Sequence, residues 1–176
     1  STIAKSVAEF TLAMILNCLR RIPQYVEAMH MKDWDYKNRG DIETFDLRGK
    51  VVGIVGFGKV ARELVQLLKP FEVNILVYDP FTESEQLTAY NVRKVNLNEL
   101  LLASDIVTLH AASTPETYHM IGEKELKLMK PSAYIINTAG PLIDENALVK
   151  ALKEKWIAGA ALDRFDQEPL QKNSPL

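Results

Sequence analysis

The sequence lacks several features that would mark particular protein classes. Cys18 is the only cysteine among 176 residues, so neither an intrachain disulfide framework nor a cysteine-based zinc cage is expected. The net charge is only -2, which gives no electrostatic reason to expect nucleic acid or an anionic membrane as a partner. The longest apolar stretch, residues 10–19, contains Asn17 and is too short to span a bilayer. Lys5 and Glu9 interrupt the N-terminal segment, so no signal peptide is predicted and a cytoplasmic location is expected.

What is present is the composition of one globular domain, with 47% hydrophobic and 25% charged residues. Residues 1–31 show apolar side chains at helical spacing from Ala8 to Met29, and Pro23 should kink or split this helix near Arg21. Phe10, Met14 and Leu16 add apolar surface beyond one seam. We therefore expect a second copy of the chain to cover this region. Residues 32–50 are polar and predict a connecting loop.

From Lys50 onward, short apolar runs without polar alternation are separated by helical segments. The predicted strands are 51–55, 74–78, 91–95, 105–109, 133–137 and 157–162, and the predicted helices are 59–69, 97–103, 123–129 and 145–154. Asn96 with Glu99 predicts a capping box, and Asp144 should cap the last helix. This alternation predicts an α/β fold, a Rossmann-type doubly wound parallel sheet with strand order 3-2-1-4-5-6. Functional residues should then follow the carboxyl ends of the strands.

A glycine-rich turn follows the first predicted strand. Gly56, Gly58 and Ala61 give the pattern G-x-G-x-x-A at the start of a helix, where the amides of Lys59 and Val60 would face a pyrophosphate. Asp79 ends the second strand, 21 residues after Gly58, close to the spacing expected for a carboxylate that binds a ribose. A carboxylate at this position favours NAD over NADP, because it repels a 2′-phosphate.

Six ordered motifs resemble one family. The segments "SVAEFTLAMIL", "LRGKVVGIVGFGKVA", "VYDPF", "DIVTLHAASTPETYHMIG", "LKLMKPSAYIINTA" and "AGAALDRFDQEPL" are together similar to the NAD-binding domain of D-isomer-specific 2-hydroxyacid dehydrogenases, with phosphoglycerate dehydrogenase-like members nearest. The resemblance covers essentially all of residues 1–176 and implies NAD as cofactor, a 2-oxo or 2-hydroxy acid as substrate, and homodimers. It also implies that the substrate domain and the segment bearing the catalytic histidine lie outside this sequence.

The resemblance assigns roles residue by residue. Glu168 stands at the position of the catalytic glutamate, and Asp163 matches the acid on the nicotinamide side. The cofactor positions that it implies, together with those read from the glycine turn, are Gly56, Gly58, Lys59, Val60, Asp79, His110, Ala111, Thr117, Thr138, Ala139 and Asp163. No metal site is implied. His30 and His119 are interpreted as solvated helix or loop residues.

One family residue is missing. The family pattern Asn-x-x-Arg-Gly reads here as "NTAGPLID", one residue shorter and without the arginine that binds the substrate carboxylate. Arg164 is the nearest arginine in sequence and is one possible substitute. We expect this chain to bind NAD(H) without turnover, and its full-length parent to be slow unless another arginine fills the role. The alternative is a non-catalytic, NAD-responsive dimeric scaffold, like the corepressor relatives of the family.

Overall fold

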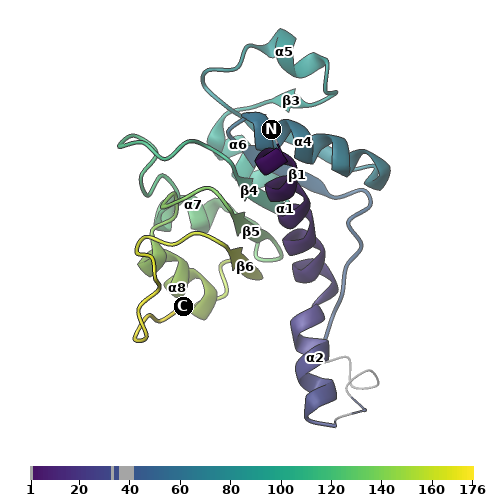
Figure 1. Cartoon of the computed structure of the whole chain (residues 1–176), viewed down its shortest axis with the longest axis vertical. Coiled ribbons are helices and arrows are strands. Elements are labelled where there is room, and N and C mark those ends of the chain that lie inside the picture. Colours follow the sequence, from purple (N-terminus) through teal and green to yellow (C-terminus); the bar gives the residue numbers. More distant parts are fainter. Residues whose placement is uncertain (1, 33, 36–41) are drawn as a thin grey trace.

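The computed structural model describes residues 2–32, 34–35 and 42–176. Its centre is a six-stranded parallel sheet in the order β3-β2-β1-β4-β5-β6, as predicted (Figure 1). The strands are β1 (Val51–Val55), β2 (Asn74–Tyr78), β3 (Arg93–Lys94), β4 (Ile106–Leu109), β5 (Tyr134–Asn137) and β6 (Gly159–Leu162). Each lies within its predicted range. β3 keeps only two of five predicted residues, consistent with its polar sequence at the sheet edge.

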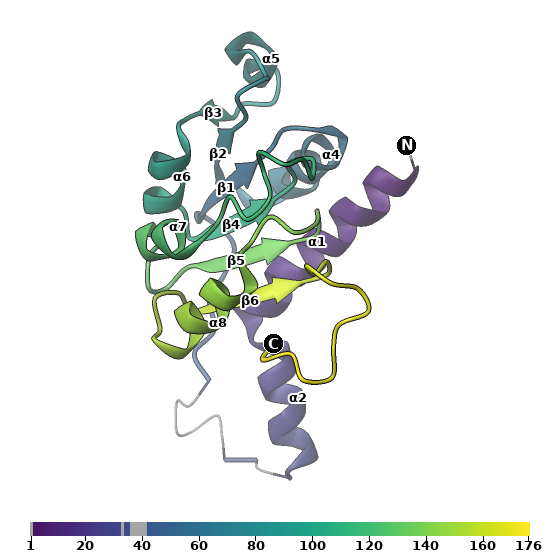
Figure 2. The same ribbon diagram turned by 90° about the vertical axis from the view of Figure 1, so that its left-hand side faces the viewer.

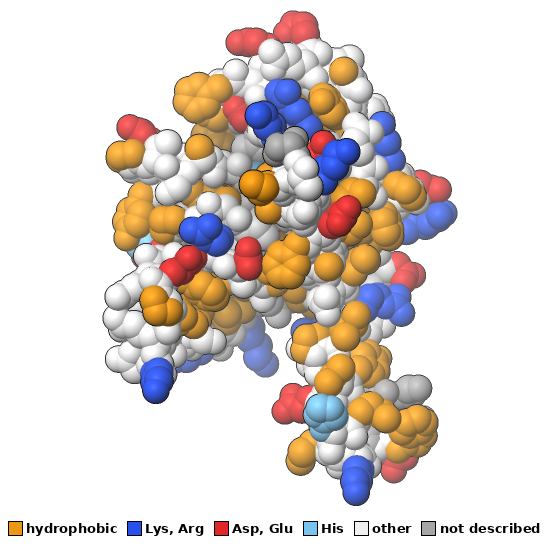
Figure 3. Space-filling model, viewed as in Figure 1, with side chains coloured by type: hydrophobic (Ala, Val, Ile, Leu, Met, Phe, Trp, Pro, Cys, Tyr) orange, Lys and Arg blue, Asp and Glu red, His pale blue; other side chains and the backbone are white. Residues whose placement is uncertain are grey.

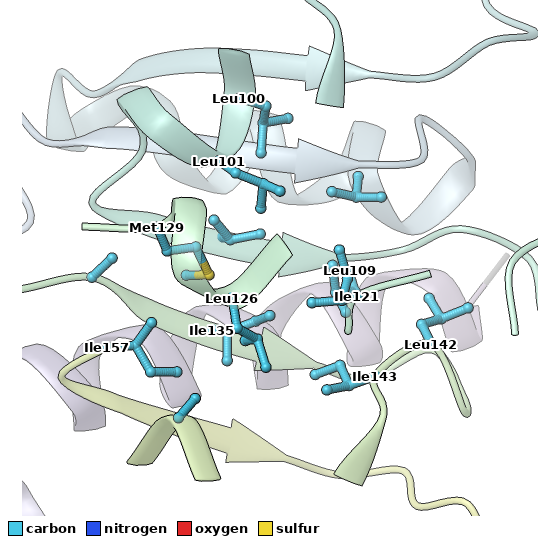
Figure 4. Close-up of a cluster of buried hydrophobic side chains, with 14 of the residues drawn as sticks. Leu100, Leu101, Leu109, Ile121, Leu126, Met129, Ile135, Leu142, Ile143 and Ile157 are labelled. Carbon is cyan, nitrogen blue, oxygen red and sulfur yellow. The ribbon is translucent and has the colours of Figure 1, made fainter. Parts of the chain in front are cut away.

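Helices cover both faces of the sheet. The helices after β1 are α4 (Lys59–Leu68), the 3-10 turn η1 (Lys69–Phe71), α5 (Ser84–Thr88), α6 (Leu97–Ala103), α7 (Glu123–Leu128) and α8 (Glu145–Lys153). One face of the sheet is covered by leucines of α6 and α7 and by alanines of α8. These side chains form one core cluster with Ile135 and Ile157 (Figure 4). The other face packs on α4 and on the N-terminal helix α1 (Thr2–Arg20). Burial on both faces explains why the strands show no polar alternation.

Two helix starts follow the predicted capping residues. Asp144 Oδ1 accepts hydrogen bonds from the amides of Asn146 and Ala147, at 3.0 and 3.2 Å. Asn96 Oδ1 accepts one from the Glu99 amide at 2.9 Å. In a full capping box the Glu99 carboxylate would also accept a bond from the Asn96 amide. At this helix start it pairs with Arg93 instead, at 3.2 Å. The short helix α5 was not predicted, since five residues leave too little periodicity.

The N-terminal helix divides where Pro23 predicted. Arg21 adopts a left-handed conformation with φ 53°, and α2 (Ile22–His30) starts directly after it with Pro23 in its first turn. α1 buries Ala8, Ile15 and other residues in the core shared with α4. By length and composition alone α1 is long and apolar enough to cross a membrane, contrary to the prediction. Here it serves as a core helix of the domain.

α2 extends away from the domain (Figure 1). It has no buried residue, and apolar side chains gather on this projection (Figure 3). The exposed apolar residues of this region are Ile3, Phe10, Ile22, Val26, Met29, Met31 and Trp34, here called the N-terminal apolar surface. The prediction was wrong for Met14, which lies in the domain's own core.

The predicted loop 32–50 is described only in part, since residues 33 and 36–41 lie outside the described residues. Its final part has no helix or strand but is anchored. The Phe45 amide donates to the Leu19 carbonyl at 2.9 Å, and Leu47 is buried.

Candidate functional site

The carboxyl ends of the strands meet at one edge of the sheet. All neighbouring strands are parallel, and the arrowheads of β5 and β6 point the same way (Figure 2). The segments that follow β1, β2, β4, β5 and β6 therefore converge there, at residues 56–61, 79–82, 110–117, 138–141 and 163–168. In an open parallel sheet this edge, where the strand order reverses between β1 and β4, is the expected binding crevice.

The glycine turn after β1 is packed tightly on one side and open on the other. Gly56 has φ 87°, and a Cβ there would lie 2.5 Å from the Ala111 amide nitrogen, so a side chain fits neither the conformation nor the space. A Cβ on Gly58 would meet no protein atom within 4 Å. Gly58 is the N-cap of α4, whose first amides have no partner within the helix. Backbone amides at a helix N-terminus suit a pyrophosphate, as the sequence predicted for Lys59 and Val60.

Asp79 ties this turn to the end of β2. Its Oδ2 accepts a hydrogen bond from the Phe57 amide at 2.6 Å. Its Oδ1 accepts from the amides of Phe81 and Thr82 at 2.8 and 3.0 Å. An ionised carboxylate offers about four acceptor positions, so one position remains for a ribose hydroxyl. The sequence predicted the ribose role but not the three backbone bonds.

A lysine also reaches the turn after Asp79. The Lys94 Nζ donates to the Thr82 carbonyl at 2.6 Å. Lys94 is 15 positions after Asp79 in the sequence, and β3 brings it alongside by pairing with β2.

His110 follows β4 and lies against the glycine turn. Its Nε2 lies 2.9 Å from Thr108 Oγ1. Although the residue as a whole keeps some exposure, burial lowers the pKa of His110 from 6.5 to about 4, so the ring is neutral at pH 7. A neutral ring suits packing beside a cofactor, the role expected from the sequence, and not proton donation. Beyond Ala111 the loop is closed by Thr117, whose hydroxyl donates to the Ala112 carbonyl at 2.6 Å.

The loop after β5 is locked by Asn137. The buried Asn137 Nδ2 donates to the Gly140 carbonyl at 2.8 Å, and its Oδ1 accepts from the Ala139 amide at 3.2 Å. Thr138 Oγ1 lies 3.3 Å from Thr11 Oγ1 of α1, which joins the loop to the N-terminal helix. No charged side chain occurs from Asn137 to Pro141.

Glu168 belongs to the exposed segment after β6. Its Oε1 accepts hydrogen bonds from the Arg164 Nε at 2.8 Å and from the Phe165 amide at 3.2 Å. The bond from the Phe165 amide, then the Arg164 guanidinium, holds the pKa of the Glu168 carboxyl below its usual value. Asp163 joins the same edge through its amide, which donates to the Asn137 carbonyl at 2.9 Å.

His119 is a partly exposed loop residue, but its side chain is held by contacts that the sequence interpretation did not include. Its Nε2 lies 2.7 Å from Asp166 Oδ2, and its ring stacks on Tyr118 with centroids 3.8 Å apart. The Asp166 amide in turn donates to Glu145 Oε1 at 2.7 Å. These contacts join the loop after β4, the start of α8 and the C-terminal segment. Residues 47 positions apart carry no local signal of such a pair. His30, by contrast, is exposed.

Cavity volume does not locate this site. An open cavity of about 550 Å³ lies at the opposite edge of the sheet, where Val51, Asn74 and Arg93 line it at the starts of β1, β2 and β3. The carboxyl edge is distinguished by its chemistry, namely the glycine turn, the helix N-terminus and the positioned carboxylate.

Comparisons with known proteins agree with this geometry. Residues 12–176 match the family described as "D-isomer specific 2-hydroxyacid dehydrogenase, NAD binding domain". The chain belongs to this family. It is 46% identical over 174 residues to a glyoxylate reductase from Thermofilum pendens, covering 97% of this chain and 51% of that protein. It is 42% identical over 173 residues to a D-3-phosphoglycerate dehydrogenase from Methanocaldococcus jannaschii, covering 97% of this chain and 32% of that protein.

A solved structure extends the likeness. The NAD-complexed D-isomer specific 2-hydroxyacid dehydrogenase from Lactobacillus delbrueckii ssp. bulgaricus superposes with a TM-score of 0.83 at 31% identity, covering 99% of this chain and 54% of that one. The chain is thus the NAD-binding domain of this family, and its cofactor is NAD. It spans about half the length or less of the relatives named here. The open face of Gly58, the helix N-terminus and Asp79 fit the pyrophosphate and ribose of this cofactor.

Proposed function

We propose that this chain is the NAD(H)-binding part of an oxidoreductase that interconverts D-2-hydroxy acids and 2-oxo acids by hydride transfer. The observation that carries the proposal is Asp79, which holds the glycine turn at 2.6 Å and keeps an acceptor position for ribose. The names of the relatives, glyoxylate reductase and D-3-phosphoglycerate dehydrogenase, support a small 2-oxo or 2-hydroxy acid as substrate.

Each part of the carboxyl edge receives a role. Gly56, Gly58, Lys59 and Val60 bind the pyrophosphate, while Asp79 binds the adenosine ribose. The residues that line the nicotinamide side are His110, Ala111, Thr117, Thr138, Ala139 and Asp163. The bound nicotinamide supplies or accepts the hydride. Glu168 is the catalytic carboxylate, and its lowered pKa keeps it ionised at neutral pH, able to raise the pKa of a neighbouring histidine.

The chain alone should bind NAD(H) without turnover. The family arginine does not follow Ala139, and no histidine follows His119 in this sequence. We further propose a cytoplasmic homodimer that forms through α1 and α2, since the N-terminal apolar surface is a patch of the kind that marks interfaces.

The alternative function is a non-catalytic, NAD-responsive dimeric scaffold. The uncharged loop from Asn137 to Pro141 favours it. The presence of Glu168 opposes it, because a sensor has no chemical need for that carboxylate.

NADH consumption separates the two functions. The full-length protein is mixed with NADH and a panel of 2-oxo acids, and absorbance of NADH is followed. Turnover of any of them supports the oxidoreductase. NADH binding that strengthens dimerisation, with no turnover of any 2-oxo acid, supports the scaffold. The isolated chain is the matched control and should bind NADH without consuming it.

A further inference from the structure

The loop after β5 has no cationic side chain to bind an anion. Asn137 is occupied by its bonds to the Gly140 carbonyl and the Ala139 amide. Ala139, Gly140 and Pro141 carry no side-chain donor, and Pro141 lacks the backbone donor as well. A 2-oxo acid nevertheless brings a carboxylate next to its reacting carbonyl, and that charge needs a partner in a site that excludes water.

β6 places an arginine beside this loop. Leu162 pairs with Asn137 in the sheet, and Arg164 comes two residues later, just past the end of the strand. Arg164 lines the same small crevice as Asn137, Gly140 and Pro141. Arg164 therefore lies next to the segment that lacks a cation, although it comes 27 positions after Asn137 in the sequence.

Glu168 holds Arg164 by one edge only. The bond to Glu168 uses the Nε of Arg164, at 2.8 Å, and the side chain of Arg164 remains 51% exposed. Arginine has five N–H donors in a planar fork, so the Nη groups stay able to donate. The Phe165 amide also binds Glu168 Oε1, which fixes the carboxylate that orients the guanidinium.

Two other carboxylates line the crevice, and both are engaged elsewhere. Asp166 Oδ2 pairs with His119 Nε2 at 2.7 Å. Glu145 Oε1 accepts from the Asp166 amide at 2.7 Å. Neither bond involves Arg164, which leaves its outer edge for a ligand.

We propose that Arg164 binds the carboxylate of the 2-oxo acid substrate in the assembled enzyme, with Glu168 positioning its guanidinium. A planar guanidinium binds a carboxylate through two parallel hydrogen bonds, which also orients the adjacent carbonyl. The assignment rests on the proposed oxidoreductase function. It predicts that the full-length protein is active although no arginine follows Ala139.

The test compares two substrates in the full-length protein. Glyoxylate carries the carboxylate, whereas methylglyoxal is a 2-oxo aldehyde without one. Arg164→Met should lower kcat/KM for glyoxylate on the order of 10²–10³-fold, the usual effect of losing one such donor, and leave kcat/KM for methylglyoxal nearly unchanged. Guanidinium ions should partly rescue glyoxylate reduction by Arg164→Ala, and Arg164→Lys should lie between the two.

Arg48→Met is the matched control. Arg48 forms a similar exposed pair with Glu72, at 3.0 Å, but precedes β1 at the opposite edge of the sheet. This variant should leave both substrates unaffected. An arginine inserted between Ala139 and Gly140 should restore glyoxylate reduction in the Arg164→Met background.

Several results would overturn the assignment. Equal losses for both substrates would show a structural role, as would losses that follow a fall in Tm. An Arg164→Met enzyme as active as Arg48→Met would place the carboxylate elsewhere. A wild-type enzyme that binds NADH but reduces no 2-oxo acid would instead support the scaffold and remove the oxidoreductase function on which the assignment rests. Failure to bind NADH would be a different outcome, because it would refute the proposed function itself.

Discussion

Replacing Asp79 with alanine should destabilise the domain as well as weaken cofactor binding. The substitution removes the acceptor for the amides of Phe57, Phe81 and Thr82. A hydrogen bond to a charged group contributes about 1.5–3 kcal/mol. Because one of the three bonds is exposed and water replaces part of each, the expected total loss is about 2–4 kcal/mol. For a domain of this size that corresponds to a fall in Tm of about 4–16 °C.

The effect on NADH should be separable from the effect on stability. Asp79→Asn keeps one oxygen that accepts the amides of Phe81 and Thr82, but its amide group faces Phe57. Its stability should fall between wild type and Asp79→Ala. Loss of a charged bond to ribose should weaken NADH binding about 10–100-fold in Asp79→Ala, and narrow the preference of NADH over NADPH.

Urea unfolding and calorimetry with both nucleotides measure these quantities. The control is Glu83→Ala. Glu83 lies in the same turn region, at the N-cap of α5, and its side chain makes no capping bond. This variant should leave both the stability and the nucleotide affinities unchanged. Unchanged stability of Asp79→Ala would refute the view that this carboxylate holds the two turns together. Equal affinities of the wild type for NADH and NADPH would remove Asp79 from cofactor selection.

Three further predictions concern single groups and surfaces. The pKa of His110 is about 4 in the native state against 6.5, so the unfolded chain takes up the proton first as pH falls, and up to about 3 kcal/mol of stability is lost between pH 6.5 and 4. His110→Gln should flatten this part of the stability profile measured by urea unfolding. An unaltered profile would contradict the lowered pKa of His110. Burial raises the pKa of the Cys18 thiol from 9.0 to about 11, which lowers the fraction of reactive thiolate. Native protein should therefore react with Ellman's reagent at pH 8 about 100-fold more slowly than unfolded protein. Equal rates would show an accessible thiol. Sedimentation at micromolar concentration should give a mass of about twice 19.8 kDa. Val26→Glu should shift the chain to monomer, whereas Leu102→Glu, at an exposed position on α6, should leave the dimer intact. A monomeric wild type would reject the N-terminal interface.

The features that the sequence predicted are those with a local cause. Unbroken apolar runs predicted the strands, and Gly56 predicted the turn, because a left-handed backbone conformation restricts the residue type at its own position. Pro23 likewise predicted the break after α1, because proline restricts its own backbone.

The features that the sequence did not predict come from tertiary contact. His119 meets Asp166 only because the fold brings the two segments together, and Lys94 reaches the Asp79 turn only through strand pairing. Met14 has the same apolar character as Phe10, yet one is buried and the other exposed, which depends on where α4 packs. The sequence offered Arg164 as one possible substitute for the missing arginine, but its place beside Gly140 follows only from the pairing of β5 with β6.

The most direct test is to map NADH binding on the backbone amides of this chain by ¹⁵N NMR. The largest shift changes should cluster at the carboxyl edge, at residues 56–61, 79–82, 110–117 and 137–141, and Gly56→Val should abolish them. Shift changes centred on Val51, Asn74 and Arg93 would instead place the nucleotide in the cavity at the opposite edge. That result would contradict the central claim, as would the absence of any shift changes at saturating NADH.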